Sequence, residues 1–424
     1  MRKHRPKQII VIGLLICSSF ASTLLAEDTK RIHSKGNNEF AFTFYHLIDG
    51  EKGNIFYSPY SLRTALAMTY AGAKNETAEE IRSTLNFDLE GYDLHSTFLS
   101  TANDIESNED SGYELNIANS LWGQRNNNWL DEFLTVTKRY YGAGLREVDF
   151  RSNESAEEAR NEINSWVKNS TNRKIMHLIP PNELNPKIIP GNPPRIDVVQ
   201  MVLANAIYFK GDWGVHFPEE ATVEDDFFSG KDVFKTPLMH RLGGGFRYGE
   251  SDGSQILEIP YKDDRLSMIV ILPSQKIGLQ GLEKSLSQKQ FAKWNSKLRN
   301  YEKVDVFLPK FKITWSGEMS DWLKDAGMET AFKQNADFSG MIDPRLQQTP
   351  LYIGAIFQKA FVEVNEKGTE AAAATAILIN GVITTSVKIP QPVPVFRADH
   401  PFMFFIIEKV NGNILFMGRM ERPL

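Results

Sequence analysis

The sequence predicts a fold of the α+β class, because its helical patterns come early in the chain and its strand patterns come late. Amphipathic segments with helical spacing lie mainly within the first 170 residues, and apolar segments of strand length follow from residue 198 onward. The 424 residues are 42% hydrophobic and 24% charged, a globular composition that excludes long disorder. Length alone suggests two or three domains.

The first 26 residues have the three parts of a secretory signal peptide. A basic start precedes an apolar stretch at residues 9–17, which is too short to span a bilayer, and small residues lead to Ala26. Cleavage near Ala26 predicts a secreted protein, extracellular or periplasmic. An uncleaved anchor is the alternative; a lipoprotein is disfavoured because Ile16, which is not small, precedes Cys17. Losing four basic and no acidic residues changes the formal net charge from −5 to −9.

Four helices are predicted before residue 170. Residues 40–48 have apolar side chains at helical spacing. Ser58 and Pro59 mark the start of a second helix, because a hydroxyl N-cap followed by proline is a favoured beginning. The other two helices are expected from about residue 75 and over residues 156–168.

Strands are predicted in the second half of the chain. Residues 198–209 form a nearly continuous apolar run, which indicates a strand buried on both faces. Shorter apolar segments predict six further strands, at residues 256–261, 266–273, 304–308, 361–364, 403–407 and 413–418.

No constellation of residues predicts catalysis or metal binding. Cys17, in the leader, is the only cysteine, and the eight histidines lack zinc-type spacing. Residues 249–253 match the nucleophile motif of hydrolases, but a strand pattern follows them where that motif needs a helix, so we interpret them as a hairpin turn. The acidic net charge gives no reason to expect nucleic acid. We therefore expect no enzyme activity, cofactor, metal, nucleic-acid partner or membrane partner.

Residues 366–382 are the most informative segment. Helix propensity alone predicts a helix over residues 370–378, because alanine dominates there. The same stretch also alternates with a period of two: Thr369, Ala371 and the residues that continue this face are uncharged, and the single charge, Glu370, lies on the other face. The segment therefore also fits an exposed loop that can become an added strand.

The chain resembles the serpin family from about residue 38 to residue 423. The matching motifs occur in the family's order, at residues 54–61 (NIFYSPYS), 205–213 (NAIYFKGDW), 361–374 (FVEVNEKGTEAAAA), 400–402 (HPF) and 416–418 (FMG). The resemblance implies a single metastable domain over residues 38–424, with three β-sheets, about nine helices and an exposed reactive-centre loop at about residues 366–400.

The resemblance also implies an activity, the irreversible inhibition of serine proteases. A target protease cleaves the loop and forms an acyl-enzyme with it, and the freed segment inserts into the main sheet as a strand. The tethered protease is then distorted. We expect a monomeric inhibitor; a non-inhibitory serpin with a carrier or chaperone role is the alternative.

Site residues follow from the same resemblance. The hinge comprises Glu366, Gly368, Thr369, Ala371, Ala372, Ala373 and Ala374. Thr369 is expected to be the first inserted side chain that faces inward, where a charge would be costly to bury. The residues expected where the sheet parts or where the loop enters are Ser58, Ser61, Asn205, Trp213, Gln358 and Lys310. Gln358 stands where the family commonly has histidine, and Lys310 is expected to pair with Glu366 at the loop base, for about 0–1 kcal/mol if the pair is exposed.

The family's spacing from Glu366 places the reactive bond between Val382 and Ile383. A β-branched apolar side chain suits a shallow apolar pocket, so an elastase-like target is favoured. The segment after this bond is longer than the family's usual one, and its prolines are expected to make it extended. The neighbours of Val382 and Lys388 are alternative bait residues, and Lys388 would favour a trypsin-like protease.

Overall fold

The computed structural model describes residues 9–107, 111–191, 193–343, 345–346, 349–369 and 392–423, with side chains from residue 27. Within these ranges the chain forms nine α-helices: α1 (Ile9–Ile48), α2 (Pro59–Tyr70), α3 (Asn75–Thr84), α4 (Gly91–Ile105), α5 (Asp131–Tyr141), α6 (Asn153–Ser170), α7 (Gly278–Ser285), α8 (Gln288–Lys297) and α9 (Ser320–Asp325).

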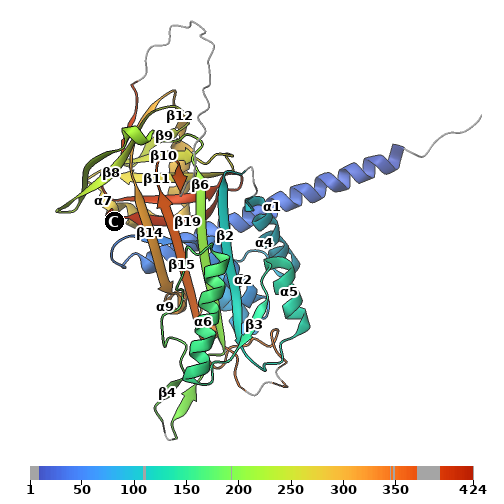
Figure 1. Cartoon of the computed structure of the whole chain (residues 1–424). Helices are drawn as coiled ribbons and strands as arrows, with labels where there is room; N and C mark the ends of the chain where they lie inside the picture. The colour runs from blue at the N-terminus through green and yellow to red at the C-terminus, as the bar shows by residue number, and fades with distance from the viewer. Residues whose placement is uncertain are drawn as a thin grey trace, which may run out of the picture.

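The strands form three large sheets and one separate hairpin (Figure 1). The seven-stranded sheet contains, in spatial order, β1 (Ile55–Tyr57), β19 (Asn413–Met420), β18 (Phe402–Glu408), β11 (Leu266–Pro273), β10 (Ser254–Pro260), β9 (Arg247–Ser251) and β12 (Arg299–Asn300). The four-stranded sheet contains β17 (Val395–Arg397), β13 (Val304–Pro309), β8 (Asp232–Gly243) and β7 (Val223–Ser229).

The six-stranded sheet contains β14 (Phe311–Glu318), β15 (Ala355–Val364), β16 (Gly368–Thr369), β6 (Met201–Asp212), β2 (Tyr113–Gln124) and β3 (Leu145–Val148). The hairpin consists of β4 (Lys187–Ile189) and β5 (Arg195–Asp197). The α+β class and the three principal sheets agree with the sequence prediction, and the nine helices counted in the described ranges match the expected number.

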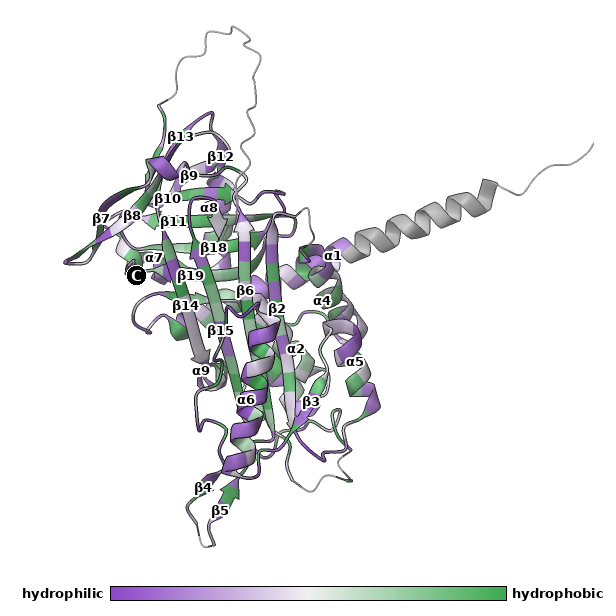
Figure 2. Cartoon of the chain, viewed as in Figure 1, coloured by the Kyte–Doolittle hydropathy of each residue, from purple (hydrophilic) through white to green (hydrophobic). Residues whose placement is uncertain are grey.

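Strand β6 lies in the interior of the six-stranded sheet, between β16 and β2, and is buried on both faces, as its apolar run predicts. Leu203 and Ile207 belong to the larger hydrophobic core, and Val202 and Ala206 belong to a smaller core under α6. Figure 2 shows the resulting apolar colouring along β6, β15 and β19. Strand β6 is thus packed against a hydrophobic core on each of its two faces.

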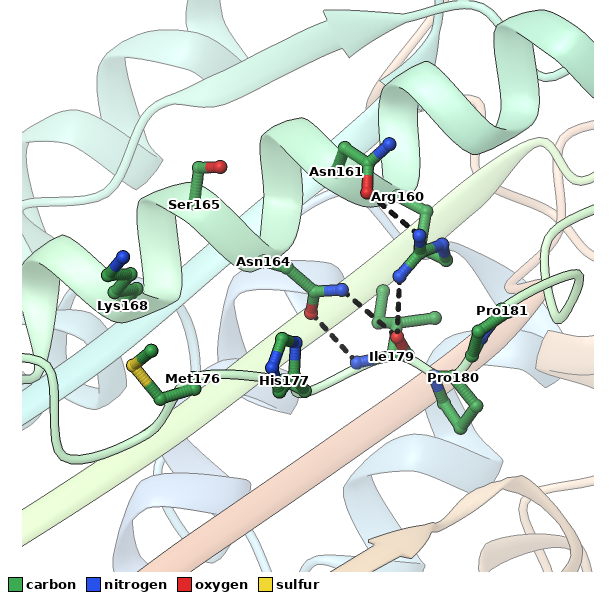
Figure 3. Close-up of a pocket in the computed structure, with 10 residues that line it drawn as sticks. All are labelled: Arg160, Asn161, Asn164, Ser165, Lys168, Met176, His177, Ile179, Pro180 and Pro181. Atoms are coloured by element: carbon green, nitrogen blue, oxygen red, sulfur yellow. Dashed lines mark hydrogen bonds between the residues drawn. The ribbon is translucent and has the colours of Figure 1, made fainter.

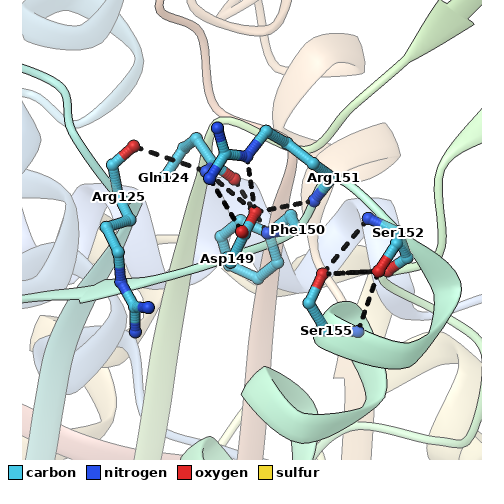
Figure 4. Close-up of polar contacts among 7 residues, drawn as sticks. All are labelled: Gln124, Arg125, Asp149, Phe150, Arg151, Ser152 and Ser155. Atoms are coloured by element: carbon cyan, nitrogen blue, oxygen red, sulfur yellow. Dashed lines mark hydrogen bonds and ion pairs between the residues drawn. The ribbon is translucent and has the colours of Figure 1, made fainter.

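Local sequence signals explain where the two helices beside this sheet begin. The Ser58 hydroxyl accepts a hydrogen bond from the Ser61 backbone N–H, and Pro59 follows at the first helical position of α2. At α6, Ser152 and Ser155 form a reciprocal capping box (Figure 4). Both helix starts are therefore fixed by their own residues.

Asp252 and Gly253, both at positive φ, form the hairpin turn between β9 and β10, and residues 249–251 are the end of β9, which confirms that this motif belongs to a hairpin. The predicted loop range, residues 366–400, differs from the structure at both ends. Gly368–Thr369 form β16, and Val395–Arg397 form β17, which pairs with β13 and buries Phe396. Both ends are strands because each pairs with neighbouring strands: β16 with β15 and β6, and β17 with β13.

No helix among the described residues has the length and apolarity needed to cross a membrane. In the same part of the chain, no group of three or more His, Cys, Asp or Glu side chains is arranged to hold a metal ion.

Candidate functional site

The hinge begins with a tight turn that folds the chain back onto β15. The Asn365 N–H donates to the Gly368 carbonyl at 2.8 Å, and the Gly368 N–H donates to the Asn365 carbonyl at 3.2 Å. The Asn365 side chain accepts from the Lys367 N–H at 3.1 Å. Glu366 and Lys367 therefore occupy the corner, and Gly368 starts a new strand antiparallel to β15.

That new strand, β16, lies between β15 and β6 at one end of the six-stranded sheet. Thr369 pairs with Val364 of β15 on one side and with Gly211 of β6 on the other. Thr369 is fully buried, and its hydroxyl shares a 2.8 Å hydrogen bond with the Tyr261 hydroxyl. Burial raises the pKa of Tyr261, so this hydroxyl stays neutral and able to donate.

Trp213 packs beside β16, at the end of the sheet where the loop is expected to enter. Its ring stacks on Tyr261 with centroids 4.9 Å apart, and its Nε1 donates to the Asn365 carbonyl at 3.0 Å. A side chain at position 368 is not tolerated in this packing, because a Cβ on Gly368 would lie 2.0 Å from the Gly211 carbonyl oxygen. The entrance therefore depends on glycine for a close backbone approach.

The predicted Lys310–Glu366 ion pair forms at the loop base, with Nζ and Oε2 3.0 Å apart. Thr222 donates to the other carboxylate oxygen of Glu366 at 2.8 Å. Burial alone raises the pKa of Glu366, but hydrogen bonds from the backbone, Lys310 and Thr222 outweigh it, so the pKa lies below its ordinary value. Glu366 is therefore an ionised anchor for the turn.

Farther along the sheet, β15 and β6 pair directly and a row of amide side chains joins three strands. Gln358 pairs with Asn205, and Asn205 pairs with Asn119 of β2. The Gln358 Nε2 donates to the Asn205 Oδ1 at 2.6 Å, and the Asn205 Nδ2 donates to Asn119 and to the Ser61 hydroxyl. Gln358 also bonds the backbone N–H and carbonyl of Ser58. These amides join the part of the sheet where β15 and β6 pair directly to the start of α2.

The opposite face of the sheet is covered by α6 and the segment that follows it (Figure 3). Asn164 of α6 accepts from the Leu178 and Ile179 N–H groups at 2.8 and 2.9 Å and donates to the Ile179 carbonyl at 3.0 Å. Lys359 of β15 donates to the His177 carbonyl at 2.8 Å. This segment is thus hydrogen-bonded both to α6 and to β15, one of the two strands that border β16.

Some predicted site residues lie outside the described residues. These are Ala371, Ala372, Ala373, Ala374, Val382, Ile383 and Lys388, together with the helical and strand interpretations of residues 370–378. The sequence analysis missed Asn119, Thr222 and Tyr261. Tyr261 is the last residue of the predicted strand at 256–261, but its contact with Thr369 joins residues 108 positions apart and leaves no local signal.

Comparisons with known proteins point in one direction. The family model described as Serpin (serine protease inhibitor) matches residues 35–423. Human serpin B3 is 37% identical over 410 residues, covering 92% of this chain and 99% of that protein. Human leukocyte elastase inhibitor is 37% identical over 401 residues, with the same two coverages.

Solved structures agree. Serpin48, described as a highly specific serpin in the insect Tenebrio molitor, has a TM-score of 0.78 at 32% identity and covers 92% of this chain and 98% of its own. Human thyroxine-binding globulin has a TM-score of 0.78 at 28% identity, covering 93% and 99%.

Proposed function

The chain belongs to the serpin family, and we propose that it inhibits serine proteases by trapping them on its own loop. The protease serine attacks the carbonyl carbon of Val382 and the peptide bond to Ile383 breaks, leaving the protease as an ester on Val382. The segment before Val382 then enters the six-stranded sheet. Burial of this segment distorts the attached protease before water hydrolyses the ester.

The observation that carries this proposal is β16, which already lies between β15 and β6. Residues of β15 and β6 that border the gap are offset by 153 in sequence number where they pair directly. The two residues facing Thr369, Val364 and Gly211, have the same offset. A strand that continues from Thr369 therefore needs no slip between its two neighbours.

Continuing that register assigns a place to each inward side chain of the loop. Ala371 and Ala373 fall beside Phe209 and Ile207 of β6, and Thr375 falls between Gln358 and Asn205. The Thr375 hydroxyl can donate and accept a hydrogen bond there, so it can bond both the Gln358 and the Asn205 side-chain amides, which insertion would separate. Ile377 follows between Ile356 and Leu203, which belong to the apolar core. The period-two pattern of the loop thus matches polar with polar and apolar with apolar.

The proposed target is an elastase-like protease, acting outside the cell in which the chain is made. Val382 suits a shallow apolar primary pocket, and one similar protein is named leukocyte elastase inhibitor. We propose that residues 1–26 are removed as a signal peptide during secretion.

A Thr369→Arg variant tests the trapping mechanism. Because Thr369 is fully buried against Tyr261, an arginine there places a charge in the entrance and slows insertion. Incubation with an elastase should give an SDS-resistant complex for the wild-type chain and for Thr369→Ser. The arginine variant should instead be cleaved at the same bond with complex reduced at least tenfold. Equal complex from both variants would contradict trapping by insertion.

Similarity to thyroxine-binding globulin keeps a carrier role as the second candidate. If the chain is a carrier, serine proteases should cut the wild-type loop without forming an SDS-resistant complex. Mass spectrometry of the cut chain then identifies the bait residue, which distinguishes Val382 from Lys388.

A further inference from the structure

The hairpin of β4 and β5 projects beyond the end of α6 (Figures 1 and 2), and Asp197 at the end of β5 accepts a hydrogen bond from the Tyr352 hydroxyl. Ile188 and Ile196 pair across the two strands and so lie on one face. Their exposures are 74% and 69%, and Ile189 on the other face is 38% exposed. Large exposed aliphatic side chains on a projecting element indicate a surface that another chain covers.

Both outer edges of this hairpin are open within the part of the chain that the structure describes, since neither strand has a second neighbour. Open edges offer backbone N–H and C=O groups to a further strand, and an isolated two-stranded hairpin has little stability of its own. Pairing with another strand would therefore satisfy the edge and cover the isoleucines together.

Prolines limit how such pairing can occur. Pro186 and Pro190 flank β4, and Pro194 directly precedes β5. Proline cannot donate to a strand ladder, so each edge offers only about three residues. A long strand pairing with several alternative registers is therefore disfavoured, and a short pairing with one defined register remains.

The sequence of β5 is complementary to itself. When two copies of Arg195–Asp197 run antiparallel about a two-fold axis at Ile196, Arg195 faces Asp197 of the second copy and Asp197 faces its Arg195. The two Ile196 side chains meet at the centre. Strand β4 lacks this property, because the same operation sets Lys187 opposite Ile189. Charge complementarity therefore selects the β5 edge.

We propose that a second copy of this chain docks through β5, forming a symmetric four-stranded sheet in the order β4, β5, β5, β4. One face of this sheet carries a continuous row of Ile188 and Ile196 from both copies. Because only a few residues contribute from each side, the buried area falls below the ~1,200 Å² of a stable interface. The dimer therefore forms at high protein concentration and dissociates on dilution.

This inference is independent of protease trapping. The hairpin lies at the end of the molecule opposite β12 and β13, and β13 pairs with β17, the strand that follows the loop (Figure 2). Docking at β5 leaves the gap between β15 and β6 untouched. The dimer and the inhibitor can thus be tested separately, and failure of one leaves the other standing.

Paired cysteine variants test the geometry in the full chain with Cys17→Ser. In the proposed dimer the two residues at position 196 face each other directly, within reach of a disulfide. The two residues at position 188 lie three strand spacings apart, about 14 Å, which is too far for a disulfide. Mild oxidation should convert Ile196→Cys to a disulfide dimer at least tenfold faster than Ile188→Cys. Equal rates for these two similarly exposed positions would overturn the proposal.

A charge reversal provides a second measurement without cysteines. In sedimentation velocity the wild-type mass should rise with concentration toward a dimer. Arg195→Asp should stay monomeric, because it faces Asp197 of the second copy, and Arg195→Asp combined with Asp197→Arg should associate again. Association of the single variant like the wild type, or a double variant that stays monomeric, would overturn docking through β5.

Discussion

The two ends of the gap between β15 and β6 are in different states. At the end near Trp213, β16 already separates the strands and Thr369 is buried between them. At the end near Ser58, the same two strands pair directly through residues 355–361 and 202–208. One pair of strands is therefore open at one end and closed at the other.

In the proposed mechanism, this contrast places the barrier to insertion at the end near Ser58. Thr369 already lies between β15 and β6, so its entry adds nothing to that barrier. Insertion of the residues after Thr369 would have to break the direct backbone pairing between β15 and β6, and then the side-chain hydrogen bond between Gln358 and Asn205. The amide row is thus the point at which the closed end resists, and changes there should affect intact and cleaved chains differently.

The largest expected effect comes from Gln358→Ala. In the intact chain this change leaves the Ser58 N–H and the Asn205 Oδ1 without their partner in a buried site, for a loss of about 3 kcal/mol in unfolding free energy. In the proposed loop-cleaved chain the Thr375 hydroxyl can donate to the Asn205 Oδ1, so mainly the Ser58 N–H loses its partner and the loss should be smaller. Chemical denaturation of both forms measures it.

Gln124→Ala is a matched control for this comparison. Gln124 is buried and accepts from the Phe150 N–H at 2.8 Å (Figure 4), but it lies in β2, which β6 separates from β16 and β15. Its removal should destabilise the intact and cleaved forms equally. The same equality for Gln358→Ala would refute the assignment of the amide row as the barrier.

A smaller effect of opposite selectivity is expected from Thr375→Val. The hydroxyl of this residue is proposed to replace the Gln358–Asn205 bond after insertion, so its loss should cost the cleaved chain about 1–3 kcal/mol. The intact chain should unfold as the wild type does. Thr375→Ser keeps the hydroxyl and should behave as the wild type in both forms. A loss confined to the intact chain would show that the continued register is wrong.

Local patterns predicted the closed end better than the open one. The apolar run of β6 and the Ser58–Pro59 helix start were predictable because each depends on neighbouring residues. Asn119 was missed because no strand was predicted where β2 lies. The alternation that includes Thr369 fitted either a loop or an added strand, and Gly368–Thr369 form β16 where β15 and β6 border them on both sides.

The ion pair at the loop base should give the smallest effect. Because the pKa of Glu366 lies below its ordinary value of 4.5 in the folded chain, ionised Glu366 stabilises the fold above that value, and this contribution is lost as pH falls through the lowered pKa. Lys310 is 39% exposed, so Lys310→Met should cost at most about 1 kcal/mol at pH 7. The difference from wild type should shrink as the pH falls below the lowered pKa of Glu366, because protonation removes its charge in both chains. Denaturation over a series of acidic pH values measures this, and a difference that grows on acidification would mean that Lys310 acts through some other contact.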